Sequence, residues 1–277
     1  MKAKPKLDIK ALFELMRPTN CLMAGLAAAL GYALAGGIVL VPAVLAFFAV
    51  FFICGAGEAI NDAFDAHIDE KNKKKKPITL GKVTSHQALY FSLILFCLGV
   101  AMASMIGFNP FVIAVIFSTL LVLYSSVLRK AKYIGNIVVA GGTAFTLIFG
   151  AISAGNVSLL IQAFAVSAFL ANMSRELAKD FEDMKTDKGF KKSMPMLSRK
   201  VTKIAIIAYY ILAASIGVLC YFAFNLSWFY LAMMLAALAV FAYSSKKLLD
   251  GNFKKSQSFS KKGMLLSILA FASALIK

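Results

Sequence analysis

Charged residues are scarce in this sequence of 277 residues. They make up 16% of the chain, against about 25% in an ordinary soluble domain. Histidine and cysteine are also rare, at two and four residues, and the absence of any Cys-x-x-Cys or Cys/His cluster disfavours a zinc site and a disulfide framework. No clear cleavage site follows the first apolar run, which is therefore expected to be retained as a span. The composition excludes a disordered protein, a coiled coil and an ordinary soluble enzyme.

Apolar residues, by contrast, are abundant. They make up 60% of the chain and give a mean hydropathy of +0.79, as expected for an all-α polytopic membrane protein. At about 20 residues per span, the apolar stretches predict nine transmembrane helices. These stretches lie at 18–36, 39–59, 86–107, 110–128, 134–154, 157–178, 203–224, 226–245 and 263–276, and the last is short for a span.

Positive charge is concentrated on one side of these predicted spans. Apart from Lys277, every lysine and arginine lies in the first seventeen residues or in or beside the connections 61–85, 129–133, 175–202 and 246–262. The positive-inside rule then places the N-terminus of a cell-membrane protein in the cytoplasm, and nine spans place its C-terminus outside. The net charge of +17 is thus mainly a topology signal, which would also attract anionic lipid.

Two segments of the sequence repeat each other at an offset of 118 residues. Segments 58–84 and 176–202 share 10 of 27 aligned residues without a gap. The offset spans four predicted helices, an even number, so both copies emerge on the same side of the membrane. The predicted architecture is a single domain over 1–277, made of two parallel four-helix repeats at roughly 18–128 and 134–245 and a ninth helix at 263–276.

Both copies contain three aspartates at the same spacing, namely Asp62, Asp65 and Asp69 in the first and Asp180, Asp183 and Asp187 in the second. Each set falls on one face of a helix. Carboxylates this close repel one another unless a cation binds them, and ligands that are all hard oxygen favour Mg²⁺ or Ca²⁺ over zinc. Because Mg²⁺ completes its shell with water and substrate phosphate, the flanking lysines suggest a metal-bridged diphosphate site. The alternative, solvated acids paired with loop lysines, does not account for the same spacing occurring twice.

These motifs strongly resemble those of the UbiA-type intramembrane prenyltransferases. The stretch at 61–69 is similar to the first aspartate-rich motif of that family, and the stretch at 180–187 is similar to the second. Further family segments are resembled by Arg-Pro-Thr-Asn at 17–20, by Tyr124 with Arg129, and by Gly-Asn at 135–136. The resemblance implies nine transmembrane helices around a central cavity open to lipid, and Mg²⁺-dependent transfer of a polyprenyl chain from a diphosphate to an acceptor.

The same resemblance implies roles for individual residues. Asp62, Asp65, Asp180 and Asp183 are expected to be the catalytic metal ligands, and Asn61, Asp69 and Asp187 are expected to complete the metal shell. The candidate contacts to the diphosphate or to an anionic acceptor are Asn20, Lys73, Lys74, Tyr124, Arg129, Lys130 and Lys132. Each lysine could instead be solvated, Tyr124 could serve core packing, and Asn20 could form a hydrogen bond between helices.

The residues leave more than one acceptor open. The stretch at 17–31 is most similar to archaeal family members that join geranylgeranyl diphosphate to geranylgeranylglyceryl phosphate, forming the second ether bond of archaeal membrane lipids. An aromatic acid like 4-hydroxybenzoate, in quinone biosynthesis, is the alternative acceptor. A cation transporter is a more distant alternative, because it would need acids in the middle of spans, whereas these acids lie at span ends. The expected partners are a prenyl diphosphate, a lipid-like acceptor and the bilayer, with no nucleic acid and no obligatory protein partner.

Overall fold

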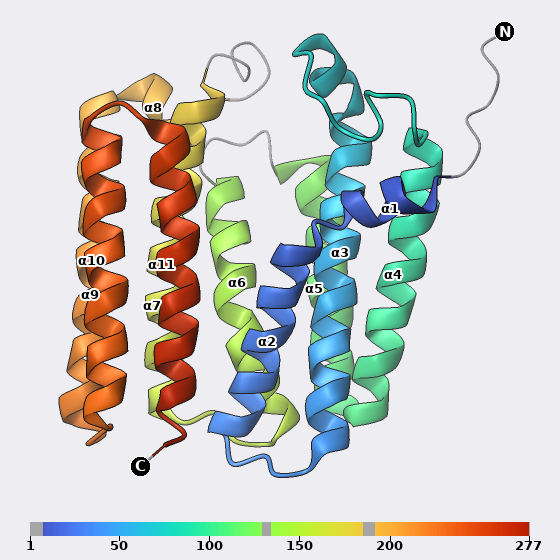
Figure 1. Ribbon diagram of the computed structural model, residues 1–277. Helices are drawn as coiled ribbons and strands as arrows, with labels where there is room; N and C mark the ends of the chain where they lie inside the picture. The colour runs from blue at the N-terminus through green and yellow to red at the C-terminus, as the bar shows by residue number, and fades with distance from the viewer. Residues whose placement is uncertain (1–7, 129–133, 185–191, 277) are drawn as a thin grey trace, which may run out of the picture. The chain divides into compact units, whose positions relative to one another are not determined.

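The computed structural model describes residues 8–128, 134–184 and 192–276 (Figure 1). Every regular element within these ranges is a helix, which confirms the all-α prediction. The described chain forms two compact units. Unit 1 comprises residues 8–29 and 39–128, and unit 2 comprises residues 30–38 and 134–276.

Unit 1 contains the first five helices. They are α1 (Ile9–Leu15), α2 (Pro18–Leu34) as far as residue 29, α3 (Leu40–Lys71), α4 (Ser85–Ile106) and α5 (Phe108–Ser126). Polar side chains define where two of these helices begin. Asp8 accepts a hydrogen bond of 3.1 Å from the backbone N–H of Ala11, and Thr84 forms a reciprocal capping box with Gln87.

The short helix α1 packs against the part of α3 that follows its most apolar stretch. Three apolar residues of α1, namely Ala11, Leu12 and Leu15, share a core with Ala59 and Ala63 of α3. Figure 1 shows α1 crossing close to α3 and α4. This packing supports the segment of α3 on which the first acidic motif lies.

Unit 2 contains the remaining helices together with residues 30–38. They are α6 (Ile134–Ser153), α7 (Leu159–Asp183), α8 (Met194–Leu197), α9 (Arg199–Ala223), α10 (Trp228–Leu249) and α11 (Phe253–Ser273). Two buried hydroxyls join α7 to α9, because Ser167 donates to the carbonyl of Ala213 and Ser174 donates to that of Ile206, both at 2.9 Å. Such hydrogen bonds hold helices together where no hydrophobic driving force acts between them.

A buried polar cluster joins α9, α10 and α11. Ser244 of α10 donates to the carbonyl of Ser256 at 2.8 Å, and its Oγ lies 3.1 Å from Ser260 Oγ. The Tyr210 hydroxyl of α9 bonds to the same Ser260. The three serines are fully buried and Tyr210 is 3% exposed, so each of these helices supplies partners for polar groups of the others.

The backbones of α2 and α6 come very close within unit 2. A Cβ atom built on Gly31 would lie only 2.0 Å from the carbonyl oxygen of Leu147. Residue 31 therefore has to be glycine for this approach.

Six of the helices are long and apolar enough to cross a membrane: α3, α4, α5, α6, α9 and α10. The chain is therefore a multi-pass membrane protein, whereas the predicted number of nine spans is not confirmed. α2 is shorter, at 17 residues, and α7 and α11 carry more polar residues. The predicted start of the last helix at 263 is wrong, because α11 begins at Phe253. Its first half, FKKSQSFSKK, is helical but charged, so the apolar run marked only the second half.

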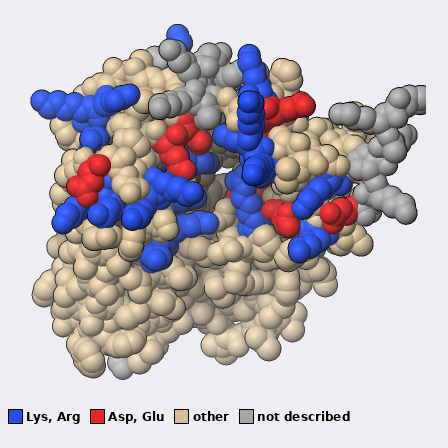
Figure 2. Space-filling model, turned by 45° about the horizontal axis from the view of Figure 1, so that its top comes forward, with Lys and Arg blue, Asp and Glu red and all other residues tan. Residues whose placement is uncertain are grey.

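Charged side chains gather on one part of each unit. In unit 1 they come mainly from α1, the end of α3 and the following loop, and in unit 2 from the end of α7, the start of α9 and the α10–α11 turn. In Figure 2 the blue and red residues lie apart from an uncharged tan surface on the face in view. The charges and the predicted site residues thus share one end of the helices in each unit.

Candidate active site

The first acidic motif lies on α3, which continues as a helix well past its most apolar stretch. Because α3 is unbroken as far as Lys71, Asp62, Asp65 and Asp69 lie on one face of it. Asp62 and Asp69 are only 4% and 3% exposed, and Asp65 is half-buried. Carboxylates buried to this extent require counter-charges or a bound cation.

A lysine from the loop after α3 bridges the two most buried carboxylates. Lys76 Nζ lies 2.8 Å from Asp62 Oδ1, to which it donates a hydrogen bond, and 2.6 Å from Asp69 Oδ2. Lys74 Nζ is farther away, at 3.7 Å from Asp69 Oδ1. One ammonium group therefore neutralises both ends of the motif.

Local backbone geometry turns these lysines back toward α3. Lys73 adopts the left-handed conformation, with a φ of 51°, and reverses the chain at the helix end. The Lys74 N–H then donates to the carbonyl of Asp69 at 2.9 Å, and the Lys76 N–H donates to Thr79 Oγ1 at 2.9 Å. The loop is thus built to hold Lys76 over the acids.

The start of α2 contributes a second basic contact in unit 1. Arg17 forms an ion pair with Glu58, and its Nη2 lies 2.8 Å from Asp62 Oδ1. Asn20 donates to Glu58 Oε1 at 2.7 Å. Glu58 lies one turn before Asp62 on α3, so α2 orients the acidic face from its N-terminal side.

The second acidic motif begins near the end of α7, in unit 2. Asp180 is 4% exposed and accepts a hydrogen bond of 2.7 Å from Asn136 Nδ2 of α6. Asp183 is half-buried and is the last residue of α7. Asp187 lies outside the described residues. An asparagine at the start of one helix thus orients an acid on the next helix, as Asn20 of α2 orients Glu58 in unit 1.

α7 carries further buried charge one turn before Asp180. Arg175 Nη1 lies 2.8 Å from Glu176 Oε1 and 3.3 Å from Asn172 Oδ1. Asn172 in turn donates to Thr143 Oγ1 of α6 at 2.7 Å. Charged side chains this close to an apolar helix stretch are costly and mark a functional region.

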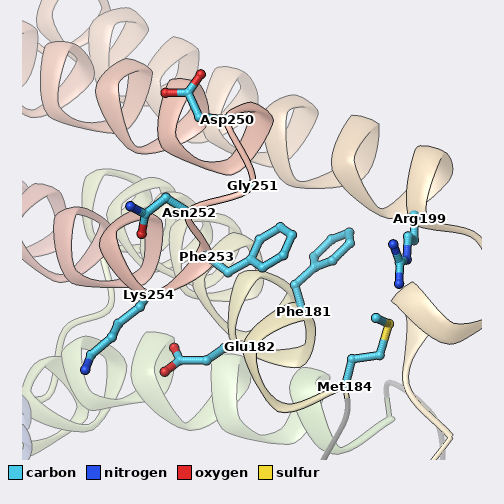
Figure 3. Close-up of a pocket in the computed structure, with 9 residues that line it drawn as sticks. All are labelled: Phe181, Glu182, Met184, Arg199, Asp250, Gly251, Asn252, Phe253 and Lys254. Carbon is cyan, nitrogen blue, oxygen red and sulfur yellow. The ribbon is translucent and has the colours of Figure 1, made fainter.

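An open cavity of about 710 Å³ lies beside the end of α7 (Figure 3). The rings of Phe181 and Phe253 stack on each other there, with centroids 4.8 Å apart. Charges of both signs surround them, from Glu182, Arg199, Asp250 and Lys254, and Met184, Gly251 and Asn252 complete the lining. None of the predicted site residues that the structure describes lines this cavity, although Phe181 and Glu182 lie between Asp180 and Asp183 in the sequence.

The first motif fits a hard divalent cation. Its potential ligands are all oxygen, and Lys76 already shows that Asp62 and Asp69 converge on one positive group. Asn61 Oδ1 and Asp69 Oδ2 are buried and accept no hydrogen bond from the described chain. No three His, Cys, Asp or Glu side chains among the described residues lie close enough together to hold a metal ion as the structure stands.

The other predicted contacts are spread over unit 1. Lys73 is exposed, Asn20 binds Glu58, and Tyr124 lies half-buried on α5. Lys74 faces Asp69. The predicted contacts Arg129, Lys130 and Lys132 lie outside the described residues.

The side chains that contact the buried aspartates include Arg17, Lys76 and Asn136, which were not among the predicted site residues. Arg17 and Asn136 lie inside the family-like motifs at 17–20 and 135–136, and their place in these motifs could have identified them as site residues. Lys76 is the last of four consecutive lysines, and sequence alone does not show which of the four turns inward.

In each unit, then, a helix carries a buried aspartate near its C-terminal end, and a basic or amide side chain contacts that aspartate. This defines a multi-pass membrane protein with buried acids near the ends of two of its helices. The sequence model of the UbiA prenyltransferase family matches residues 22–269, and the chain belongs to this family.

Individual proteins show the same relationship. The digeranylgeranylglyceryl phosphate synthase of Methanopyrus kandleri is 36% identical over 272 residues, which cover 97% of this chain and 100% of that protein. A solved structure of digeranylgeranylglyceryl phosphate synthase is similar with a TM-score of 0.77 at 31% identity, over 97% of this chain and 98% of the other. A UbiA homolog from Archaeoglobus fulgidus, bound to GPP and Mg²⁺, has a TM-score of 0.69 over 94% of this chain and 99% of its own, and at 16% identity it shows a shared fold only.

Proposed function

We propose that this protein transfers a geranylgeranyl group from geranylgeranyl diphosphate to geranylgeranylglyceryl phosphate in a Mg²⁺-dependent reaction. The product would carry the second ether bond of archaeal membrane lipids. The observation that supports this acceptor is the similarity, at 36% identity over nearly the full length of both chains, to a protein named for that synthesis. The buried carboxylates Asp62, Asp69 and Asp180 support the diphosphate and metal part of the proposal.

The proposed reaction assigns a task to each acidic motif. Asp62, Asp65 and Asn61 would hold the cation in unit 1, and Asp180 and Asp183 in unit 2, with Asp69 and Asp187 completing the shells. Bound Mg²⁺ would neutralise the negative charge that builds up on the diphosphate leaving group. Lys74 adds positive charge at the same place, because it already faces Asp69.

The rest of the reaction takes place on the substrates. The C–O bond of the prenyl diphosphate breaks, leaving an allylic carbocation and diphosphate. Apolar side chains exclude water from the cation, since a water molecule there would give the free alcohol. The free hydroxyl oxygen of the acceptor then bonds to the allylic carbon and loses its proton.

We also propose a membrane arrangement for this reaction. It has nine spans, formed by two four-helix repeats and a ninth helix around a central cavity, with the N-terminus and the acidic motifs on the cytoplasmic side. The internal repeat and the one-sided distribution of lysine support this arrangement. The C-terminus would then lie outside.

Product mass spectrometry on purified protein tests the proposal. The protein is given labelled geranylgeranyl diphosphate with either geranylgeranylglyceryl phosphate or 4-hydroxybenzoate, in Mg²⁺ or in EDTA. We expect a two-chain glycerol phosphate in Mg²⁺ only, and none from Asp62→Asn or Asp180→Asn, which should remain folded and inserted. A prenylated benzoate instead would overturn the proposed acceptor, and turnover by either variant would overturn the role of the acids.

A further inference from the structure

Lys76 is not an ordinary loop lysine. Its side chain is only 23% exposed, although it ends a run of four lysines. Its backbone N–H is held by Thr79 at 2.9 Å, and its carbonyl accepts from Leu80 at 2.9 Å. Lys75, its direct neighbour, is exposed. The loop therefore selects one ammonium group and places it between Asp62 and Asp69.

This ammonium satisfies the two carboxylates unequally. It donates a hydrogen bond to Asp62 Oδ1 at 2.8 Å. Asp69 Oδ2 lies 2.6 Å from it but accepts no hydrogen bond from the described chain. Asn61 Oδ1, next to Asp62 in sequence, is also buried without a donor. The hydrogen bonds of the Lys76 ammonium thus satisfy only some of the oxygen acceptors in this part of the site.

A divalent cation and the Lys76 ammonium cannot use these carboxylates together. Arg17 already shares Asp62 Oδ1 with Lys76. A doubly charged cation bound between Asp62 and Asp69 would occupy the position of the ammonium itself, where like charges repel strongly in a partly buried setting. The lysine can leave easily, because its four-carbon stem rotates without moving the backbone.

We infer that Lys76 competes with the divalent cation for Asp62 and Asp69, so that its ammonium compensates these buried acids until the cation displaces it. Lys76 is in this sense a positioning residue: it holds the two acids in place until binding of the cation releases it. The inference rests on the proposed function only for the identity of the cation, which is taken to be Mg²⁺.

Metal titration without substrate tests the competition directly. Mn²⁺, a spectroscopic substitute for Mg²⁺, is titrated into protein in the Asp180→Asn background, so that the first motif is measured alone. Lys76→Met should bind Mn²⁺ roughly tenfold or more tightly than the parent, since no ammonium has to be displaced. Lys75→Met removes the same charge from the neighbouring exposed position and should change binding little. Unchanged affinity in Lys76→Met, or an equal gain in Lys75→Met, would overturn the inference.

Lysine labelling of the unmutated protein gives a second measurement, which does not depend on how well a variant folds. In EDTA, an amine-reactive reagent should modify Lys76 more slowly than Lys75, as read by mass spectrometry of the loop peptide. Saturating Mn²⁺ should speed the labelling of Lys76 severalfold and leave Lys75 unchanged. If Mn²⁺ does not alter the labelling of Lys76, the ammonium is not displaced and the inference fails. A protein that shows this exchange but forms no prenylated product would refute the proposed function alone.

Discussion

Three buried aspartates, Asp62, Asp69 and Asp180, carry most of the chemistry inferred for this protein. Each is at most 4% exposed, and each is contacted by a side chain from another element of its unit. Lys76 reaches the first two from the loop after α3, and Asn136 reaches the third from α6. Because a buried carboxylate has few partners, the loss of one partner leaves an oxygen without a hydrogen bond and frees the side chain to change its orientation.

Asn136→Ala should lower kcat/KM for prenyl transfer by about ten- to hundredfold, because Asp180 loses the amide that orients it. Steady-state kinetics at several Mg²⁺ concentrations should show part of this loss as a higher Mg²⁺ requirement. Asn156→Ala changes an exposed asparagine of the same unit and is the matched control. A variant at position 136 with unchanged kinetics at every Mg²⁺ concentration would show that the hydrogen bond has no role in positioning.

For individual residues, the sequence predicts the acids of the site better than it predicts the side chains that contact them. Asp62 and Asp180 are predictable because identical spacing occurs twice, and a repeated pattern of acids is rare in so apolar a chain. Lys76 is not predictable in the same way. Its selection among neighbouring lysines depends on the reversal at Lys73 and the hydrogen bond to Thr79, two details of loop geometry that a run of identical lysines does not reveal.

At the scale of whole helices, some predictions from the sequence agree with the structure and others do not. α3 runs through its acidic motif, as the helical spacing of the aspartates predicted, whereas α7 includes Asp180 and ends at Asp183, within the second motif. The start of α11 was placed too late, because hydropathy detects apolar surface and not helix as such. The first half of α11 is a helix with charged residues, so its true start at Phe253 carries no apolar signal.

Close helix packing leads to a prediction about two glycines of unit 2. Gly31→Ala should destabilise the protein by about 1–3 kcal/mol, because the added methyl group would overlap the Leu147 carbonyl of α6. Gly141→Ala, in α6 itself, is the matched control. No atom of the described chain lies within 4 Å of its Cβ position, so the change should be neutral or stabilising by up to about 1 kcal/mol.

Thermal unfolding of both glycine variants in the same detergent gives the comparison. The melting temperature of Gly31→Ala should fall, and that of Gly141→Ala should stay or rise. Equal melting temperatures for the two variants would contradict the close approach of α2 to α6.

At the scale of the whole molecule, the distribution of charge leads to a prediction about orientation. In a background without native cysteines, a cysteine at position 108 should react with a membrane-impermeant reagent added outside the cell, because Phe108 is 77% exposed and lies at the uncharged α4–α5 connection. Lys75→Cys lies in the basic loop and should react only after the membrane is opened. The reverse labelling pattern would invert the proposed topology.

The polar contacts between neighbouring helices bear on how the chain enters the membrane during synthesis. α7 and α11 are not among the helices apolar enough to span a membrane unaided, and a charged residue within an inserting helix costs about 2.5–3.5 kcal/mol. Each follows directly on a helix that holds partners for its polar groups: Thr143 of α6 bonds to Asn172 of α7, and Ser244 of α10 bonds to Ser256 and Ser260 of α11. We expect these helices to insert as hairpins, so the order of synthesis delivers the partner before the helix that needs it.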